Sequence, residues 1–305
     1  MNGFEENIYK EIKKELEQNV IEKRVNTYVT NKNELNHYYN VGKMIVDAQG
    51  GEEKAKYGDG LIKMYSKRLT NELGKGYDPS TIKRMRQFYL IIEKGVQVAH
   101  QLSWSHYSSL LPLNDINEIN YYIDQAITYH WGRNTLRDKI KSKEYQRLSD
   151  KTKNKLIRKE ELNIYDSIKN PITINTYNAN NEKISEKILK EFILRDMDNF
   201  LLQLGNGFAY MANEYKITPG IKTNYIDILL YNVIYNCYVV VELKVVESNK
   251  DHLGQIQVYM NYIDKHLKKT NQSKTIGIIV CRRDDKYLIE YSSDDRIRIT
   301  TYELV

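Results

Sequence analysis

Residues 223–262, TNYIDILLYNVIYNCYVVVELKVVESNKDHLGQIQVYMNY, decide the fold of this chain of 305 residues. Two apolar runs, at residues 225–231 and 237–246, have the length and the β-branched and aromatic content of strands. The segment between them contains asparagines, which favours a hairpin turn. Residues 251–267 then predict a helix. The expected unit is therefore strand, turn, strand and helix.

Three charged residues lie inside these apolar strands: Asp227 in the first, Glu242 and Lys244 in the second. An unpaired charge removed from water is costly or changes its pKa, so one shared site is the better explanation. Alternate strand residues point to the same face, and hairpin pairing brings Asp227 opposite the other two. Two carboxylates suit a hard divalent cation, and the lysine can orient or deprotonate a water or stabilise charge on a phosphoryl oxygen. The alternative is a buried ion pair on an ordinary sheet.

Gln255 and Tyr259 complete the pattern, because residues four apart share one face of a helix. Asp, Glu-x-Lys and Gln-x-x-x-Tyr in this order resemble the PD-(D/E)XK nuclease superfamily, and the last segment resembles its RecB-like branch. More closely, and over nearly its whole length, the chain resembles the YhcG-like PD-(D/E)XK proteins. The proline of the superfamily's name is absent, since Tyr225 and Ile226 precede Asp227. The segments that carry the resemblance are YYNVGKMIV, YGDGLIKMYSKRLTNELGKGY, RQFYL, QLSWSHYSSLL, FLLQLGNGFAY, YIDILLYN, VVVELKV, GQIQVYMNYID and TIGIIVC.

The resemblance implies an enzyme that uses Mg²⁺ or Mn²⁺ to hydrolyse phosphodiester bonds of DNA. Asp227, Glu242 and the backbone carbonyl of Leu243 would hold the metal. Lys244 would position the attacking water or stabilise the charge that develops on the phosphate.

The other site residues that the resemblance implies lie on helices. Gln255 would hold Lys244 or the metal-bound water, and Tyr259 would contact the phosphate or pack under the site. Members of this class commonly place one more acid on the helix before the sheet. Glu191 is the candidate for this further metal ligand and Glu186 is another, while Lys190 stands about where relatives often carry the acid.

Composition limits the classes of protein and of partner. A net charge of +6 and a pI of about 8.9 suit a polyanionic partner. Cys237 and Cys281 lie in apolar strands without a Cys-x-x-Cys motif, which argues against a zinc site or a disulfide framework and fits a reducing cytoplasm. No apolar stretch approaches a membrane span, and the first residues lack the pattern of a signal peptide. We expect a cytoplasmic protein that binds DNA, without membrane association or a small-molecule substrate.

The length predicts two domains, each large enough for its own core. Residues 1–165 predict an all-α domain with the outline of a helix-turn-helix, and the resemblance implies that it is a winged-helix-like DNA-binding module. Residues 166–182, with a proline and an asparagine cluster, predict a linker. Residues 183–305 predict an α/β domain with the mixed sheet of a restriction-endonuclease-like PD-(D/E)XK protein. Beside the motif strands, its expected elements are helices at residues 185–204 and 284–291 and strands at 208–217, 274–281 and 296–304.

A pair of helices around a glycine turn is the main sign of DNA binding in the first domain. An amphipathic helix at residues 61–73 ends at Gly74, and a second helix starts with Asp78 or Ser80 as its cap. The alternative to a helix-turn-helix is a helical hairpin with a solvated basic face. The side chains that a recognition helix would present are Lys83, Arg84, Arg86 and Gln87.

Residues 133–159 are rich in lysine and arginine and poor in acids, with Arg137 and Lys141 among the basic residues. Such a run is usually a solvated helix face, but beside a nuclease it would lie along a phosphate backbone and give salt-dependent affinity. Residues 131–134, WGRN, depart from the Trp-Ser and Arg usual in the family, so no phosphate contact is assigned there. In the segment QLSWSHYSSLLPL, we interpret Trp104 as a packed side chain and His106 as a hydrogen-bonded one.

The sequence therefore predicts a metal-dependent DNA endonuclease of repair, recombination or defence, with a DNA-binding domain in front. Duplex cleavage by enzymes with one site per chain generally needs two active sites, which favours a homodimer. The alternatives are a structure-selective junction resolvase, a DNA-binding accessory protein that does not cleave, and a partner protein whose basic face binds protein or RNA.

Overall fold

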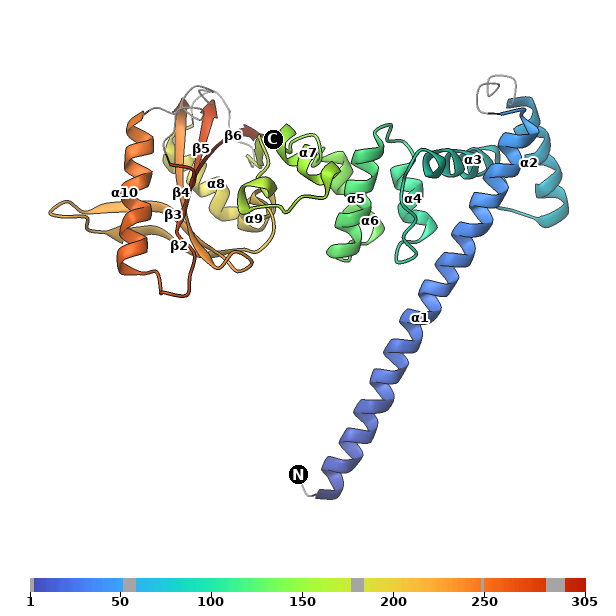
Figure 1. Ribbon diagram of the computed structural model, residues 1–305, viewed down its shortest axis with the longest axis horizontal. Helices are drawn as coiled ribbons and strands as arrows, with labels where there is room; N and C mark the ends of the chain where they lie inside the picture. The colour runs from blue at the N-terminus through green and yellow to red at the C-terminus, as the bar shows by residue number, and fades with distance from the viewer. Residues whose placement is uncertain (1–2, 52–58, 177–183, 248–249, 284–293) are drawn as a thin grey trace. The chain divides into compact units, whose positions relative to one another are not determined.

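The computed structural model describes residues 3–51, 59–176, 184–247, 250–283 and 294–305 (Figure 1). The chain forms two compact units, Met1–Tyr145 and Gln146–Val305. The described part of the first unit is helical, and the second combines helices with a mixed sheet. This confirms the predicted fold class.

The division between the units lies before the predicted linker at residues 166–182. That stretch overlaps a 3₁₀ helix, η2 (Ile164–Ser167), and contains a strand, β1 (Ile172–Ile174), which pairs with the last strand of the sheet. Ile168, Ile172 and Ile174 are buried in the core of the second unit. The first part of the stretch is therefore a structural part of that unit, because its isoleucines pack inward between polar residues. Residues 177–182 lie outside the described residues.

The first unit begins with a 46-residue helix, α1 (Gly3–Ala48). The second half of α1 packs against α3 (Pro79–Glu93) and buries Leu35, Ile45 and Val46. Residues 9–30 are exposed at every position. The apolar side chains of this exposed half are Tyr9, Ile12, Leu16, Val20, Ile21, Val25, Tyr28 and Val29.

The helix α2 (Asp59–Leu73) and α3 form the predicted pair around a glycine turn. Gly74 and Gly76 have φ of +93° and +111°, a region in which a residue without Cβ is not strained. The Asp78 carboxylate accepts hydrogen bonds from the backbone N–H groups of Ser80 and Thr81, which confirms the predicted cap.

Three further helices complete the first unit: α4 (Trp104–Leu110), α5 (Ile116–Thr128) and α6 (Arg133–Lys141). The Trp104 ring packs against Tyr38 and Phe88, with ring centroids 4.5 and 5.4 Å apart. His106 Nε2 lies 3.1 Å from the carbonyl oxygen of Trp131. Trp104 and His106 are thus packed and hydrogen-bonded, as predicted.

The sheet of the second unit has six strands in the order β1-β6-β5-β4-β3-β2. The remaining strands are β2 (Phe208–Ile217), β3 (Asn224–Asn232), β4 (Cys237–Glu247), β5 (Ile276–Arg283) and β6 (Ile297–Leu304). The strands β2, β3 and β4 pair antiparallel, whereas β4, β5, β6 and β1 pair parallel. The Asn232 side chain accepts hydrogen bonds from the N–H groups of Ile234 and Tyr235, which closes the predicted β3–β4 hairpin.

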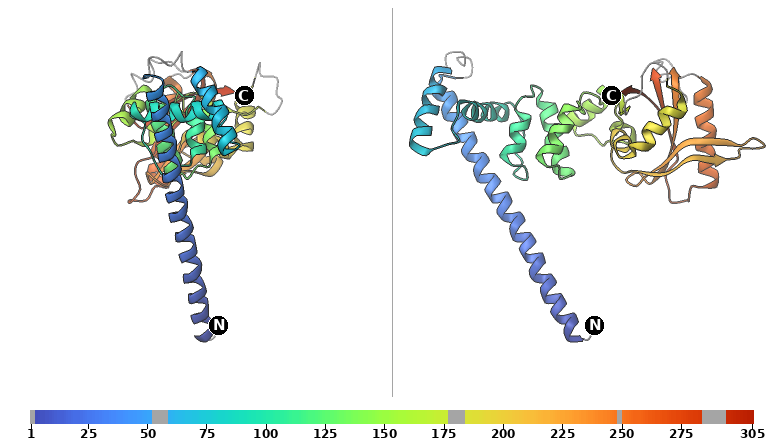
Figure 2. Two further views of the ribbon diagram at one scale, coloured as in Figure 1. Left: turned by 90° about the vertical axis from the view of Figure 1, so that its right-hand side faces the viewer. Right: turned by 180° about the vertical axis from the view of Figure 1, so that it is seen from behind.

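Helices cover both faces of this sheet (Figures 1 and 2). The helices α8 (Glu186–Arg195) and α9 (Met197–Leu204) pack with Val239 and Val241 of β4, and α10 (Lys250–His266) packs on the other face with Val240. By strand alternation, Glu242 and Lys244 belong to the α10 side. This is the feature of the fold that positions the site.

The predicted helix at residues 185–204 is two helices, because Asp196 leaves the helical conformation, with φ of −129°, and caps α9 through a hydrogen bond from the N–H of Asn199. The predicted helix at 284–291 lies outside the described residues. The unit also includes α7 (Asp150–Arg158) before η2.

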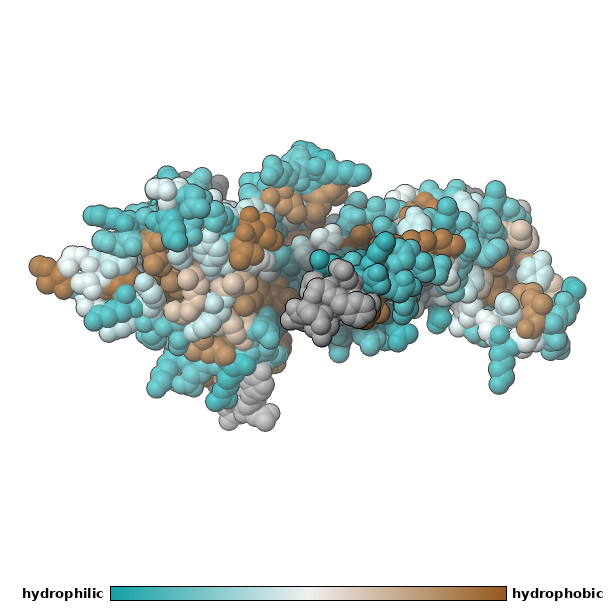
Figure 3. Space-filling view, turned by 90° about the horizontal axis from the view of Figure 1, so that it is seen from below, coloured by the Kyte–Doolittle hydropathy of each residue, from teal (hydrophilic) through white to brown (hydrophobic). Residues whose placement is uncertain are grey.

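Within the described ranges, no helix is both long and apolar enough to cross a membrane. In the view of Figure 3, hydrophilic residues predominate and apolar residues form separate groups. This surface agrees with a mean hydropathy of −0.63.

Candidate active site

The β3–β4 hairpin brings the two acids of the motif together. The backbone pairing of β3 with β4 reaches Ile228 and Val241, so the next positions outward are Asp227 and Glu242. Beyond the last backbone pair, the Asp227 side chain joins the two strands: its Oδ2 accepts a hydrogen bond of 3.0 Å from the N–H of Leu243. Asp227 is thereby fixed against the strand that carries Glu242 and Lys244.

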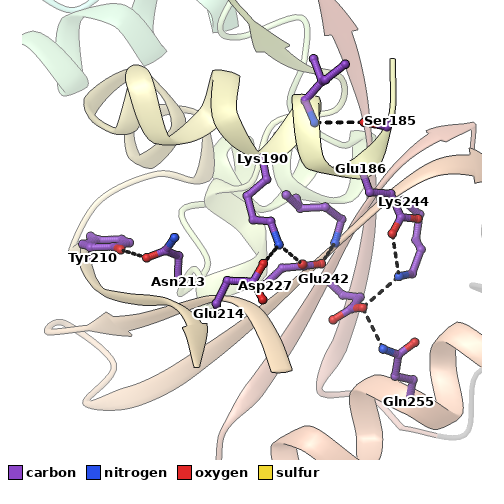
Figure 4. A network of polar contacts seen from close by, with 12 residues as sticks. Ser185, Glu186, Lys190, Tyr210, Asn213, Glu214, Asp227, Glu242, Lys244 and Gln255 are labelled. Carbon is purple, nitrogen blue, oxygen red and sulfur yellow. Dashed lines mark hydrogen bonds and ion pairs between the residues drawn. The ribbon is translucent and has the colours of Figure 1, made fainter. Parts of the chain in front are cut away.

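Glu242 is the most buried charged group of the site, with a side chain only 3% exposed. Its Oε1 accepts hydrogen bonds of 2.9 Å from Lys244 Nζ and from Gln255 Nε2 (Figure 4). Its Oε2 is buried and has no hydrogen-bond partner among the described residues. Burial, and then the nearby charge of Asp227, raises the pKa of Glu242 to about 7, against the opposing effect of Lys244. A buried carboxylate oxygen without a donor is a position where a cation would be stabilised.

Lys244 lies between two carboxylates. Its Nζ is 2.9 Å from Glu242 Oε1 and 3.6 Å from Glu186 Oε2 of α8. Burial acts to lower the pKa of Lys244, but the charge and hydrogen bond of Glu242 outweigh it and the pKa is raised. Lys244 is therefore a cation that can donate hydrogen bonds, and a weak general base.

Lys190, which stands about where relatives often carry an acid, pairs with two acids of the site. Its Nζ lies 2.8 Å from Asp227 Oδ1 and also contacts the carboxylate of Glu214 on β2 (Figure 4). Glu214 has φ of +50°, which is uncommon for a residue with a side chain and lies next to a candidate site here. The sequence signal was the four-residue spacing of Glu186 and Lys190, which puts both on the face of α8 that meets the acids.

Gln255 and Tyr259 lie on the α10 side of the cluster. Gln255 uses one amide nitrogen for two hydrogen bonds, to Glu242 Oε1 at 2.9 Å and to Tyr259 Oη at 2.8 Å. Tyr259 is buried in the core under the sheet. Gln255 therefore holds Glu242, whereas its predicted partner was Lys244 or a metal-bound water.

The donor set is small for a metal site. No cluster of three or more His, Cys, Asp or Glu side chains with a metal-binding arrangement occurs in the described part of the chain. Asp227 and Glu242 are the two carboxylates that converge, and Glu186 is the acid of α8 that reaches the cluster through Lys244. Glu191, the predicted further ligand, is exposed on α8. It is offset from Glu186 and Lys190 around the helix, so the structure favours Glu186 over Glu191.

The six predicted DNA-binding residues divide between two hollows of the first unit. Arg84, Arg137 and Lys141 line one of them. The other three, Lys83, Arg86 and Gln87, line a different hollow. There Arg86 Nε donates a hydrogen bond of 2.6 Å to Gln49 Oε1, and Gln87 Nε2 donates one to the carbonyl oxygen of Leu111. The four polar residues of α3 therefore do not form a single recognition surface.

Two family models match the chain. Residues 165–305 match the YhcG PDDEXK nuclease domain, and residues 11–147 match the DUF1016 N-terminal domain. The chain thus combines a region that matches the DUF1016 N-terminal domain with one that matches the YhcG PDDEXK nuclease domain. The protein "Putative nuclease YhcG" of Escherichia coli (strain K12) is 24% identical over 284 residues, which cover 80% of this chain and 75% of that protein. The chain is thus a nuclease of the PDDEXK type.

Two solved structures resemble part of the chain. A repair endonuclease from Pyrococcus abyssi matches with 16% identity and a TM-score of 0.30, over 42% of this chain and 49% of its own. The EndoMS–dsDNA2 complex matches with 18% identity and a TM-score of 0.29, over 42% of this chain and 48% of its own. Each match spans about half of the solved chain.

Proposed function

We propose that the chain is a divalent-metal-dependent endonuclease that hydrolyses phosphodiester bonds of DNA in the cytoplasm. The observation that carries the proposal is the buried, unsatisfied Oε2 of Glu242, which lies beside Asp227 on the facing strand. Burying a carboxylate oxygen without a hydrogen-bond donor lowers the stability of the cation-free protein. A bound cation offsets this cost.

The residues that would hold Mg²⁺ or Mn²⁺ are Asp227, Glu242 and the carbonyl of Leu243. The N–H and C=O of a strand residue point to the same side, and the N–H of Leu243 points to Asp227. Oxygen donors of this kind suit both ions. When bound, the cation would polarise the scissile phosphate and lower the pKa of the attacking water.

The protein groups around the acids have separable tasks. Lys244, fixed by Glu242, would donate a hydrogen bond to a non-bridging phosphate oxygen or orient the water, and it would stabilise the negative charge that builds up in the transition state. Gln255 holds the Glu242 carboxylate, and Tyr259 holds Gln255. Both are positioning residues in this proposal, since their contacts run through Glu242.

The proposal includes a homodimer, because cutting both strands of a duplex generally needs two active sites. The exposed half of α1, residues 9–30, is the surface that we assign to the second copy. Its apolar side chains are about half exposed, with Leu16 at 60%, and both basic and acidic residues are interspersed among them. A helix of this composition is self-complementary and is stabilised by packing its apolar face on a like helix. Light scattering would test this dimer. We expect the mass of a dimer for the wild type and the mass of a monomer for Leu16→Lys.

The test of the activity is a cleavage assay in Mg²⁺ with duplex, single-stranded, flapped and branched DNA, run beside Glu242→Ala and Lys244→Ala. We expect cleavage by the wild type, no cleavage by either variant, and DNA binding retained in all three. Cleavage of branched DNA alone would identify a junction resolvase. Binding without cleavage of any substrate would identify an accessory protein, and equal cleavage by wild type and variants would refute the site.

A further inference from the structure

A hollow on the first unit gathers basic side chains that are distant in the sequence. It has a volume of about 680 Å³ and lies between α3, α4 and α6. We call it the basic groove. It is lined by Arg84, Trp104, Ser105, Ser108, Ser109, Pro112, Leu113, Arg133, Arg137, Ile140 and Lys141. Four of these residues are cations and none is an acid.

The walls of the groove are fixed by packing behind it. The α6 helix is anchored by Leu136, which is fully buried, and α6 packs against α4. His106 of α4 bonds to the carbonyl oxygen of Trp131, just before α6, and Lys139 Nζ lies 5.3 Å from the centre of the Trp131 ring. The cations are therefore presented by a preformed surface.

The four cations of the groove have no acidic partner in the described part of the chain, in contrast to a lysine beside them. Lys139, on the same helix, pairs with Glu144 at 2.8 Å. Arg84, Arg133, Arg137 and Lys141 make no ion pair with any residue in the described ranges. Cations gathered without acids repel one another, and an anionic ligand relieves that repulsion.

The spacing of the cations indicates a chain of anionic groups rather than one anion. Arg133, Arg137 and Lys141 follow one another at four-residue intervals, so they lie on one face of α6 and about 6 Å apart along its axis. This is the order of the distance between neighbouring phosphates of one strand. Arginine forks bind phosphate oxygens with two hydrogen bonds, and the serine hydroxyls of α4 can add further donors.

We propose that the basic groove binds the phosphate backbone of DNA, and that it, rather than a recognition helix on α3, is the DNA-binding site of the first unit. Arg133, in the segment that departs from the family pattern, becomes one of its central residues. The choice of DNA as the polyanion rests on the proposed function, whereas the anion site itself does not. Contacts to phosphates predict affinity that is salt-dependent and insensitive to base sequence.

The test measures binding without cleavage. Fluorescence anisotropy of a labelled 30-base-pair duplex in EDTA would compare the full-length wild type with Arg133→Gln/Arg137→Gln. The matched control is Lys63→Gln/Lys67→Gln, which removes two exposed charges at the same spacing on α2. We expect the groove variant to lose at least tenfold in affinity and to lower the slope of log Kd against log salt by about 2, because each phosphate contact contributes roughly 0.9. The control should change affinity less than about threefold.

A second pair of variants separates charge from folding. Arg133→Lys/Arg137→Lys keeps both charges and should bind within about fivefold of the wild type, and circular dichroism melts should overlap for all proteins. The inference is overturned if the groove variant binds as well as the control, if its salt slope is unchanged, or if the wild type binds RNA or anionic vesicles but not DNA. Failure of the nuclease assignment would look different: DNA would bind through the groove while Mg²⁺ produced no cleavage.

Discussion

The two candidate sites of this chain handle charge in opposite ways. In the second unit, Glu242, Lys244, Asp227 and Lys190 are largely buried and already paired with one another. In the basic groove of the first unit, the cations are held on a rigid surface without counter-ions.

The difference indicates two tasks. Buried, paired charges are expensive to assemble but keep a fixed geometry in a medium of low dielectric, which suits chemistry on a developing charge. Solvated, unpaired cations cost little and attract polyanions at long range, which suits binding. Variants in the two sites should therefore separate DNA cleavage from DNA binding.

The sharpest separation is expected from Glu242→Gln. This change keeps the shape and the acceptor for Gln255 but removes the negative charge. We expect the rate of supercoiled-plasmid nicking in Mg²⁺ to fall about 10³-fold, because several kcal/mol of transition-state stabilisation depends on the metal that the carboxylate holds. The affinity for DNA in EDTA should change less than about twofold. Glu191→Gln, an exposed acid of α8, is the control and should nick at the wild-type rate.

A variant at Lys190 tests whether the ion pair between Lys190 and Asp227 competes with binding of the metal ion. In Lys190→Gln, the metal no longer displaces an ammonium group from Asp227. A charged hydrogen bond contributes about 1.5–3 kcal/mol, so Mn²⁺ affinity should rise about 10- to 100-fold. Calorimetric titration of DNA-free protein measures this, and Lys187→Gln, an exposed lysine of the same helix, should leave the affinity unchanged. A variant that binds Mn²⁺ more weakly than the wild type would show that Lys190 supports the site.

The pH dependence of metal binding follows from Glu242. Its pKa is raised to about 7, and the metal binds the deprotonated form. Mn²⁺ affinity should therefore increase about tenfold between pH 6 and pH 8, as the proton is released. Titrations at these two pH values measure the change. An affinity that is flat over this range would show that Glu242 is already ionised at pH 6.

The same raised pKa makes the free energy of unfolding depend on pH. The direction is opposite to that of a salt-bridged acid, whose pKa is lowered. The native state keeps the proton up to about pH 7, whereas the unfolded chain releases it near its ordinary value of 4.5. The free energy of unfolding of the metal-free protein should thus fall as pH rises between these values, by on the order of 3 kcal/mol. Urea unfolding of Glu242→Gln should lack this fall, and saturating Mn²⁺ should oppose it in the wild type.

The smallest effect is expected at the edge of the cluster. Tyr259→Phe removes the hydroxyl that accepts a hydrogen bond from Gln255 and keeps the buried ring. A single neutral hydrogen bond contributes about 1 kcal/mol, so we expect nicking to slow about fivefold without a change in Mn²⁺ affinity. Tyr262→Phe, one turn away on α10, is the control. A loss near 10³-fold would instead indicate that Tyr259 contacts the reacting phosphate.

The strands and helices that carry the motif were predictable because their signals are local. Residues that are close in sequence determine the apolar runs of β3 and β4 and the helix cap at Asp78. Alternation then placed Glu242 and Lys244 on one face, and the hairpin brought Asp227 to them. The helix at residues 185–204 was predicted, but its break at Asp196 depends on that side chain, which caps the following helix.

What tertiary structure decided is which charges meet. The sequence places Lys190 about where relatives often carry an acid and Glu214 on a strand near the site, but only the packing of α8 over the edge of the sheet joins both to Asp227. The basic groove likewise combines Arg84 with three cations about fifty residues further on. Local patterns set the faces of helices and strands, whereas the partners of a side chain are set by the packing of segments distant in sequence, since electrostatic and hydrogen-bond energies depend on proximity in space.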